Sequence, residues 1–391
     1  MSREIRILVT GGGTGGHVTP AIAVVRAIRE QAQNTDWKPV FRYLGNKRGI
    51  ESKLAVEADI EFEGVESGKL RRAFNLRGYF TSENIADAFR IPVGIVQALW
   101  KVWQFHPHVV LSTGGYVSVP PVIAAWLLRV PVITHEQTVQ MGLANRITAR
   151  FARTIALTFE GAAQELSPRL RRKTRVTGNP VRSIIFKGDR EKAIARSGFD
   201  PIDNHLPTLY VTGGAQGARI INRAIEAVLG ELLPLCRIMH QCGQQPAGDE
   251  QDYDRLAKVE SSLPEQLRHR YWLTRFVGDE IGDVFALTDL VISRAGAGTV
   301  TEVSALGKPT IFIPLVPTGG DEQTRNAKRS VEAGAAVIIP QAELNGVRLL
   351  DEIKKLLKNT EQLETMGKAA RTLARPNAAH DLAQVVLQAV L

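Results

Sequence analysis

The sequence predicts an α/β protein made of two doubly wound domains, each built on a parallel sheet. Apolar runs rich in Val, Ile and Leu end in glycine and alternate with helical patterns, which is typical of parallel sheets covered on both faces. The length of 391 residues favours two domains over one. An opening of strand, glycine turn and amphipathic helix begins at Val9 and again at Val211, so both domains are expected to share one design.

In the first half of the chain, buried strands are expected at residues 5–10, 39–45, 106–115 and 129–137. The helix after the first strand is expected to begin near Thr19, which would cap it, with Pro20 in its first turn. Ile22, Val25 and Ile28 would then form its buried face.

The second half repeats this rhythm, with strands expected at residues 207–214, 236–243, 289–297 and 308–315. A polar stretch rich in Gly, Pro and Asp, residues 175–207, marks the boundary, so we predict domains at residues 1–182 and 183–375. The last segment, residues 376–391, is predicted to be a helix with one apolar stripe. That stripe consists of Leu382, Val385, Val386, Ala389 and Val390.

Composition narrows the class of protein. The chain has 49 Lys+Arg against 40 Asp+Glu, a net charge of +9, which points to an anionic partner. No signature of a nucleic-acid-binding module occurs, so nucleic acid is not an expected partner. Two cysteines are too few for a disulfide framework, and neither a secretory signal nor an apolar run of membrane-spanning length occurs. We therefore expect a protein of the reducing cytoplasm.

One region combines positive charge with aromatic side chains. Its densest basic cluster consists of Lys69, Arg71, Arg72 and Arg77. A helix over residues 91–105 would bring together the apolar residues Val96, Leu99, Trp100 and Trp103. Two interpretations stay open: this helix faces the core, or it docks together with the basic cluster on an anionic membrane surface.

Five glycine-rich turns stand where strands are expected to end. Glycine lets a ligand approach the backbone, and a helix N-terminus offers unpaired N–H groups, so such ends suit a phosphate. Because the carboxyl ends of parallel strands share one edge of a sheet, we expect the turns to line one cleft. Each turn alone is equally compatible with a tight connection. They are residues 11–16, 114–115, 213–217, 296–298 and 319–320.

His17 and Glu302 each have a chemical and a structural interpretation. His17 follows the first glycines near a helix start, where a neutral imidazole suits a general base; a bond to a nearby carbonyl is the alternative. Thr299 and Glu302 have capping-box spacing, so the residues alone favour Glu302 as a helix cap over an acceptor for sugar hydroxyls.

No metal site is predicted. Cys236, His240 and Cys242 lie close together in the sequence, but they lack a fourth ligand nearby and follow a strand pattern. We interpret them as packing residues.

Taken together, the motifs resemble those of the MurG family, the transferases that convert lipid I to lipid II in peptidoglycan synthesis. Seven motifs occur in the family order over nearly the full length: "GGTGGHVTPAIA", "STGGYVSVP", "HEQTVQMGLANRI", "TGNPVR", "GGAQGARIIN", "RAGAGTVTE" and "GDEQTRNA". The resemblance implies the GT-B glycosyltransferase fold, with two Rossmann-like domains facing each other across a cleft. It also implies that the C-terminal domain holds the UDP-sugar and the N-terminal domain takes the lipid-linked acceptor and meets the membrane. Residues 376–391 would pack back on the N-terminal domain.

The resemblance also implies roles for individual residues. His17 would deprotonate the acceptor 4-hydroxyl in an inverting transfer of GlcNAc from UDP-GlcNAc, and Arg182 would face the UDP phosphates. Val277 would present its backbone to uracil, and Glu302 would bind the ribose. The other residues implied on the side of the sugar donor are Thr14, Gly15, Gly16, Thr138, Ala215, Ala297, Gly298, Thr299, Val300, Thr301, Gln323 and Asn326. Those implied on the acceptor side are Tyr116, His135, Glu136 and Asn145.

Two positions depart from the family pattern. Thr138 stands where the family usually has asparagine, and Ala215 stands where it usually has serine. Threonine keeps a hydroxyl but loses the amide, and alanine loses the hydroxyl altogether. Both changes bear on the affinity and specificity for the sugar donor.

The family resemblance implies that no metal or other cofactor is required, because a helix N-terminus and Arg182 can stabilise the leaving UDP. The implied partners are UDP-GlcNAc, lipid I, an anionic phospholipid surface and other cell-wall enzymes, at the cytoplasmic face of a bacterial plasma membrane. The implied processes are cell-wall biogenesis, cell shape and cell division. Two alternatives stay open: a related GT-B enzyme that makes glycolipids, and a UDP-sugar-binding protein without catalysis.

Overall fold

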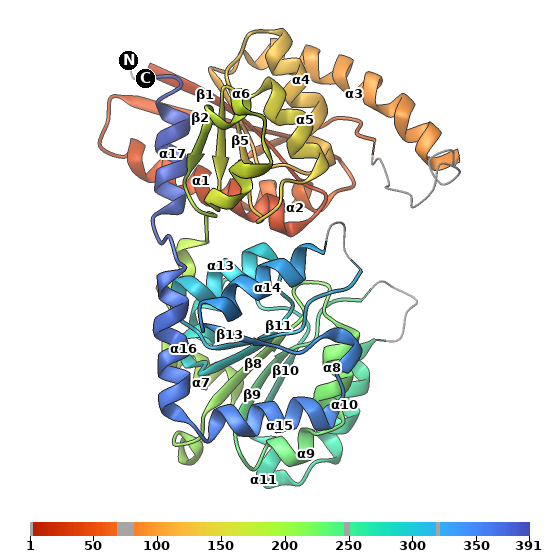
Figure 1. Cartoon of the computed structure of the whole chain (residues 1–391), viewed down its shortest axis with the longest axis vertical. Helices are drawn as coiled ribbons and strands as arrows, with labels where there is room; N and C mark the ends of the chain where they lie inside the picture. Colours follow the sequence, from red (N-terminus) through yellow and green to blue (C-terminus); the bar gives the residue numbers. More distant parts are fainter. Residues whose placement is uncertain (1–2, 69–81, 246–250, 318–320) are drawn as a thin grey trace. The chain divides into compact units, whose positions relative to one another are not determined.

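The computed structural model describes residues 3–68, 82–245, 251–317 and 321–391, with the backbone alone for residues 82–89. The chain divides into two compact units (Figure 1). The first comprises Met1–Arg182 and Arg375–Leu391, and the second comprises Ser183–Ala374. Part of the sequence-based prediction lies outside the described residues. It consists of Lys69, Arg71, Arg72 and Arg77, and the turn at residues 319–320.

The first unit is built on a seven-stranded sheet with the order β3-β2-β1-β4-β5-β6-β7, in which every neighbouring pair is parallel. The chain order reverses between β1 and β4, and open α/β sheets bind ligands at such a switch point. The strands are β1 (Arg3–Thr10), β2 (Trp37–Gly45), β3 (Glu61–Gly64), β4 (Val109–Ser112), β5 (Val132–Glu136), β6 (Thr154–Leu157) and β7 (Thr174–Val176).

Helices cover both faces of this sheet. They are α1 (Gly15–Ala32), α2 (Ile50–Glu57), α3 (Ser82–Phe105), α4 (Val119–Leu127), α5 (Leu143–Phe151), α6 (Pro168–Arg171) and α17 (Ala378–Leu387). On one face, Val9 of β1 packs in a core with Val25 and Ile28 of α1. On the other face, Leu8 of β1 packs in a core with Val102 of α3. The strands are therefore apolar on both sides, which explains why their sequence shows runs rather than alternation.

The C-terminal helix α17 belongs to the first unit, where it packs on α1. Leu382, Val385 and Val386 of its predicted stripe are buried in the same core as β1. Ala389 and Val390 are partly buried against that core.

The second unit has a six-stranded parallel sheet with the order β10-β9-β8-β11-β12-β13. Its strands are β8 (Thr208–Thr212), β9 (Arg237–Gln241), β10 (Tyr271–Thr274), β11 (Leu290–Ser293), β12 (Thr310–Phe312) and β13 (Ala336–Ile338). The helices are α7 (Arg190–Ser197), α8 (Arg219–Glu226), α9 (Leu229–Leu232), α10 (Asp252–Ser262), α11 (Glu265–Arg268), α12 (Ile281–Leu287), α13 (Ala297–Leu306), α14 (Glu322–Glu332), α15 (Gly346–Leu357) and α16 (Thr360–Thr372). The two-domain, doubly wound architecture predicted from the sequence is confirmed.

All eight predicted strands occur, and five further strands, β3, β6, β7, β10 and β13, were not predicted. These five have three or four residues each. β3 reads "EFEG" and β7 reads "TRV", so neither carries the continuous apolar run of a central strand. Both stand at the edges of their sheet, where polar residues are tolerated.

Two predicted helix starts are wrong. α1 begins at Gly15 and not near Thr19, with Thr14 as its extended N-cap residue, so Pro20 lies inside the helix. The chain already turns at Gly13, whose φ of +83° favours glycine, and the helix can therefore start at once. α13 begins at Ala297 with Gly296 as its N-cap residue, which places Thr299 inside the helix and removes its capping-box role.

Helix α3 confirms the core-facing interpretation for one of its faces, and the membrane interpretation stays a prediction for the other. Its Ala98, Val102 and Phe105 are buried in the core of the first unit. Val96, Trp100 and Trp103 are 66%, 58% and 59% exposed, and Val93 before them is 50% exposed. The helix therefore packs by one face and presents a second apolar face to the outside. We call Val93, Val96, Trp100 and Trp103 the exposed stripe.

Candidate active site

At the carboxyl edge of the first sheet, two glycine turns lie against each other. The turn after β1 and the turn after β4 are joined by a hydrogen bond from the Gly12 N–H to the Gly114 carbonyl at 3.1 Å. A Cβ on Gly115, whose φ is +81°, would stand 2.0 Å from the Gly12 carbonyl oxygen. Only glycine allows this approach, so these residues fix the backbone in front of α1.

The N-terminus of α1 is open on this edge. Thr14 makes no side-chain capping bond, and a Cβ on Gly15 would meet nothing within 4 Å. Within the described part of the chain, the N–H groups of Gly15 and Gly16 have no acceptor. Such a helix end binds negative charge.

His17, in the first turn of α1, is held by two acceptors. Its Nδ1 lies 2.9 Å from the Thr113 carbonyl oxygen and 3.1 Å from Oε1 of Gln137. Because neither oxygen can donate, the proton is assigned to Nδ1, which leaves the lone pair on Nε2. The side chain is half-buried, and no described residue bonds Nε2. His17 therefore has the tautomer that a general base needs.

Gln137 was missed by the sequence analysis as a site residue. Its Nε2 donates to the Thr113 carbonyl at 2.5 Å, which turns its Oε1 toward His17. Gln137 lies within the "HEQT" motif, so the motif itself was the signal. The 120 residues between His17 and Gln137 hide the contact from any local pattern.

Glu51 was also missed. It is fully buried, and its carboxylate accepts the Gly13 N–H at 3.2 Å and the Asn46 N–H at 3.0 Å. A Cβ on Gly12 would stand 2.5 Å from the Glu51 carboxyl carbon. Glu51 therefore occupies the space beneath the first glycine turn and supports it.

Of the four residues implied on the acceptor side, Tyr116 and Asn145 lie at the two glycine turns; Tyr116 is half-buried, and a Cβ on Gly114 would stand 2.7 Å from Oδ1 of Asn145. A Cβ on Gly13 would stand 2.7 Å from the Tyr116 ring. His135 is fully buried, with Nε2 2.9 Å from the Gly178 carbonyl, and burial lowers its pKa to about 4. Its imidazole is therefore neutral at pH 7.

Glu136 and Asn145 are buried as well, and they bind each other. Asn145 Nδ2 donates to the Glu136 carboxylate at 2.8 Å, and the Gly142 N–H donates to it at 3.1 Å. The Thr138 hydroxyl lies 2.8 Å from the same carboxylate and 2.6 Å from the Gln140 carbonyl. Thr138 is 6% exposed, so in this structure its hydroxyl serves the turn after β5.

Arg182 follows β7 as the last residue of the first unit before the chain enters the second, and it is half-buried. Its near neighbours in the sequence, Asn179 and Val181, are buried.

In the second unit, the N-terminus of α13 is the open helix end. Neither Gly296 nor Gly298 would bring a Cβ within 4 Å of another atom. The N–H groups of Ala297, Gly298 and Thr299 have no acceptor among the residues that the structure describes. Val300 is 8% exposed and Thr301 bonds the Ala297 carbonyl at 2.7 Å, so these two side chains serve the helix. Glu302 is half-buried in its second turn.

The turn after β8 is the second glycine turn of this unit. The Gly214 N–H donates to Oγ1 of Thr212 at 3.0 Å, and the Gly214 carbonyl accepts from Gln241 at 3.0 Å. Ala215 is exposed, and its carbonyl accepts the Gln244 N–H at 3.0 Å. Its N–H has no hydrogen-bond acceptor, from backbone or side chain, in the described part of the chain. The backbone N–H of Ala215 is therefore available as a donor, although the side chain offers no hydroxyl.

Gln323, at the start of α14, joins two turns. Its Oε1 accepts the Ala295 N–H at 3.2 Å and the Leu315 N–H at 3.0 Å, which leaves its Nε2 as a hydrogen-bond donor. Asn326 is 3% exposed and donates to the Ala295 carbonyl at 3.1 Å. Val277 buries its side chain, while its backbone N–H and C=O have no partner among the described residues.

Three findings concern metals and membranes. No group of three or more His, Cys, Asp or Glu side chains within the described ranges is placed to hold a metal ion. Asp252 and Asp254 have the spacing of an Asp-x-Asp triplet, but each pairs with an arginine, Arg255 and Arg275 respectively. Among the described helices, none has both the length and the apolar character that crossing a bilayer requires.

Comparisons with known proteins agree over most of the chain. Residues 7–157 match the glycosyltransferase family 28 N-terminal domain, and residues 208–382 match the glycosyltransferase family 28 C-terminal domain. A Treponema pallidum protein named UDP-N-acetylglucosamine–N-acetylmuramyl-(pentapeptide) pyrophosphoryl-undecaprenol N-acetylglucosamine transferase is 37% identical, over 97% of this chain and 94% of its own length. A Legionella pneumophila protein of the same name is 35% identical, over 93% and 92%. The crystal structure of Acinetobacter baumannii MurG superposes with a TM-score of 0.72 at 26% identity, over 98% of this chain and 99% of that one.

Proposed function

This chain belongs to the MurG family of N-acetylglucosamine transferases, and on that premise we propose how its two units divide the reaction. It is a hexosyltransferase of the GT-B fold. It transfers GlcNAc from UDP-GlcNAc, with inversion, to the 4-hydroxyl of the N-acetylmuramyl-pentapeptide of lipid I, which gives lipid II in peptidoglycan synthesis. We propose that the second unit binds UDP-GlcNAc and that the first unit binds lipid I.

The assignment of the nucleotide sugar rests on the open backbone groups of the second unit. The N-terminus of α13 and the Ala215 N–H offer fixed positive dipoles to the diphosphate. The unpaired backbone of Val277 suits the uracil edge, and the remaining Nε2 of Gln323 suits a GlcNAc hydroxyl. Glu302 would accept from the ribose hydroxyls, and Arg182 of the first unit would face the phosphates.

The single observation that carries the mechanism is the pair of acceptors at Nδ1 of His17, which assigns the proton to that nitrogen. With Nδ1 held by the Thr113 carbonyl and Gln137, the Nε2 lone pair is free to take the proton of the acceptor 4-hydroxyl. The oxygen then attacks the anomeric carbon, the bond to the UDP oxygen breaks, and the dipole of α13 stabilises the charge that develops on UDP. In this mechanism the leaving group departs without a metal ion.

The test measures the release of UDP from UDP-GlcNAc under three conditions: with a lipid I analogue, with diacylglycerol, and without an acceptor. Turnover with the lipid I analogue alone supports the proposal, and turnover with diacylglycerol instead indicates a glycolipid synthase. In the same assay, His17→Ala should lower turnover by about 10²–10⁴-fold, the usual contribution of a general base, with nearly unchanged UDP affinity. A near-normal rate in this variant would remove His17 from the mechanism.

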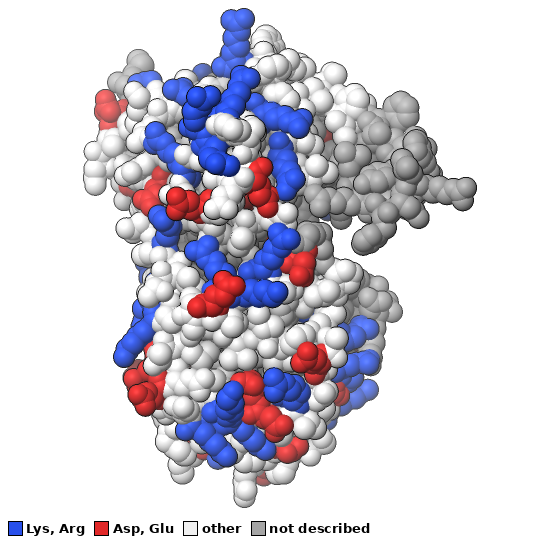
Figure 2. Space-filling view, in the orientation of Figure 1, with Lys and Arg blue, Asp and Glu red and all other residues white. Residues whose placement is uncertain are grey.

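We also propose that the first unit docks on the cytoplasmic face of the plasma membrane through the exposed stripe of α3. Helix α4 packs beside α3 and adds Trp126 and Leu127, each 50% exposed. Figure 2 shows lysine and arginine side chains gathered over the first unit around α5 and α6. A basic surface with apolar side chains suits an anionic lipid interface, where the acceptor resides. The basic cluster at residues 69–77 would add to this attraction, and other cell-wall enzymes would meet the protein there.

A further inference from the structure

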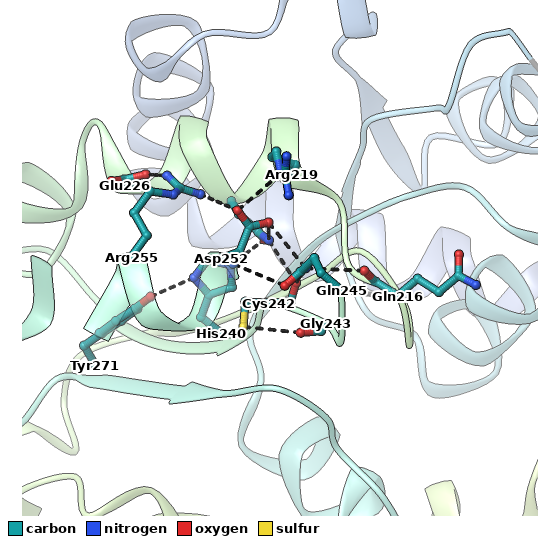
Figure 3. Close-up of polar contacts among 11 residues, drawn as sticks. Gln216, Arg219, Glu226, His240, Cys242, Gly243, Gln245, Asp252, Arg255 and Tyr271 are labelled. Atoms are coloured by element: carbon teal, nitrogen blue, oxygen red, sulfur yellow. Dashed lines mark hydrogen bonds and ion pairs between the residues drawn. The ribbon is translucent and has the colours of Figure 1, made fainter. Parts of the chain in front are cut away.

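A buried polar network lies next to the glycine turn after β8, residues 213–218 (Figure 3). It joins Asn222 of α8, His240 of β9, Asp252 of α10 and Tyr271 of β10. All four residues are at most 3% exposed. Burying polar groups costs free energy unless they are hydrogen-bonded to one another, so we ask what these four residues hold in place.

The direction of the hydrogen bonds in the network is fixed. His240 Nε2 lies 3.0 Å from Oδ1 of Asn222, so this nitrogen must donate. Its Nδ1 therefore accepts from the Tyr271 hydroxyl at 2.8 Å. Burial lowers the pKa of His240 to about 3, so the ring stays neutral at physiological pH. The amide of Asn222 has one orientation because its Nδ2 meets the Cys242 carbonyl and the Asp252 carboxylate, which can only accept, and this leaves Oδ1 facing His240.

This oriented amide holds the backbone of the turn after β9. Asn222 Nδ2 donates to the Cys242 carbonyl at 2.9 Å. That carbonyl is the surface on which the glycine turn 213–218 rests, because a Cβ on Gly217 would stand only 1.9 Å from it. A Cβ on Gly243 would likewise stand 2.1 Å from the Gly217 nitrogen. The two turns are therefore packed backbone against backbone.

Asp252 anchors the network by its charge. Its carboxylate accepts from Asn222 at 2.7 Å and from Arg255 at 2.5 Å. It also accepts from Gln245 Nε2 at 3.4 Å, and Gln245 Oε1 accepts the Asp252 N–H at 3.2 Å. The same Nε2 lies 3.5 Å from the Gln216 carbonyl, inside the glycine turn. Asp252 thus reaches both turns, through Asn222 and through Gln245. Figure 3 shows Gln245 between Asp252 and Gln216.

We propose that Asp252 is a positioning residue that holds the glycine turn 213–218 in the shape that receives the diphosphate of the sugar donor. This inference rests on the proposed function only where it places UDP-GlcNAc at that turn. Asp252 itself is fully buried and touches no substrate. It acts on the backbone N–H groups of the turn through Asn222, Gln245 and the Cys242 carbonyl.

The test compares Asp252→Asn with Asp254→Asn. Asp254 stands two residues on in the same helix, and its carboxylate is 62% exposed in a surface pair with Arg275, so it is a matched control. Hydrogen exchange of residues 213–218 and 242–245 is measured without ligand, and UDP affinity and the Michaelis constants for both substrates are measured on the full-length enzyme. We expect Asp252→Asn to accelerate exchange in both turns and to weaken UDP binding and raise the KM for UDP-GlcNAc by about tenfold. The KM for the lipid I analogue should stay unchanged.

Wild-type exchange and wild-type UDP affinity in Asp252→Asn would overturn the proposal. If that variant does not fold, Gln245→Ala decides, because it removes the bridge without leaving a buried charge unpaired; about threefold weaker UDP binding is then expected, and no change would overturn the proposal. Failure of the wild-type protein to bind UDP would instead refute the proposed function. The ligand-free exchange measurement would still test the positioning role.

Discussion

Replacing Trp100 and Trp103 together by alanine should detach the protein from anionic membranes. The two rings are 58% and 59% exposed on α3. With roughly 200 Å² per tryptophan, about 120 Å² of each is available for transfer from water, which is worth about 3 kcal/mol per ring at roughly 25 cal/mol per Å². If half of this area enters the lipid interface, the pair contributes about 3 kcal/mol, and its loss weakens binding by about a hundredfold.

Sedimentation with phosphatidylglycerol-containing vesicles measures this effect, with Ile202→Ala as the control. Ile202 is 76% exposed in the second unit, so its replacement removes exposed apolar surface that belongs neither to α3 nor to the first unit. Binding of the wild-type protein should also fall as salt is raised to about 0.5 M, because basic side chains near the surface contribute about 1 kcal/mol each and are screened. The reasoning is refuted if the double variant binds vesicles as tightly as the wild-type protein, or if high salt does not weaken the binding of the wild-type protein to the vesicles.

Three further outcomes follow from the structure. Gly217→Ala should weaken UDP binding by at least about tenfold, because its φ is +74° and the new Cβ would stand 1.9 Å from the Cys242 carbonyl. Gly230→Ala is the control, since its Cβ would meet nothing within 4 Å. Equal UDP affinities of the two variants by calorimetry would contradict this. Burial lowers the pKa of His135 to about 4 and that of His240 to about 3. Below about pH 6.5 these two histidines are therefore protonated in the unfolded chain but stay neutral in the folded protein. The free energy of unfolding should therefore be at its full value above pH 6.5 and fall by about 1.4 kcal/mol per pH unit for each histidine as the pH drops toward 4, and a flat urea-denaturation profile between pH 7 and 5 would be inconsistent with it. Transfer should persist in excess EDTA, since α13 supplies fixed dipoles for the leaving UDP; complete loss that only added Mg²⁺ reverses would show that an ion does this work.

The central strands could be predicted because their sequence and their environment agree. β4, β8, β11 and β12 are buried along their whole length, and each contains the run of apolar residues that a strand covered on both faces needs. The short strands at or near sheet edges, such as β3 and β7, are stabilised by pairing with a neighbour that lies far along the chain. Their own residues carry too little pattern to show it.

The helix starts were harder to predict, because a cap signal such as Thr19-Pro20 is local while the actual start depends on the turn before it. At α1 the positive φ of Gly13 lets the helix begin five residues before Pro20. At α13 the extended Gly296 does the same ahead of Thr299. At α1 the glycine conformation, and not the side-chain cap, decided the first helical residue. At α13 the N-cap conformation of Gly296 is one that any residue can adopt.

The motifs identified His17 as the candidate base, but they gave it no tautomer and no neighbours. Gln137 contacts His17 from 120 residues away, and Glu51 contacts Gly13 from 38 residues away. Their roles appear only when the segments after β1 and β5 meet each other and α2. The sequence by itself determined the paired doubly wound domains, the family and the glycine turns, because these depend on local residue type and spacing. Only the tertiary structure decided which lone pair of His17 is free, which face of α3 stays exposed, and that Asp252 lies buried behind a glycine turn, because each of these depends on contacts between segments distant in the chain.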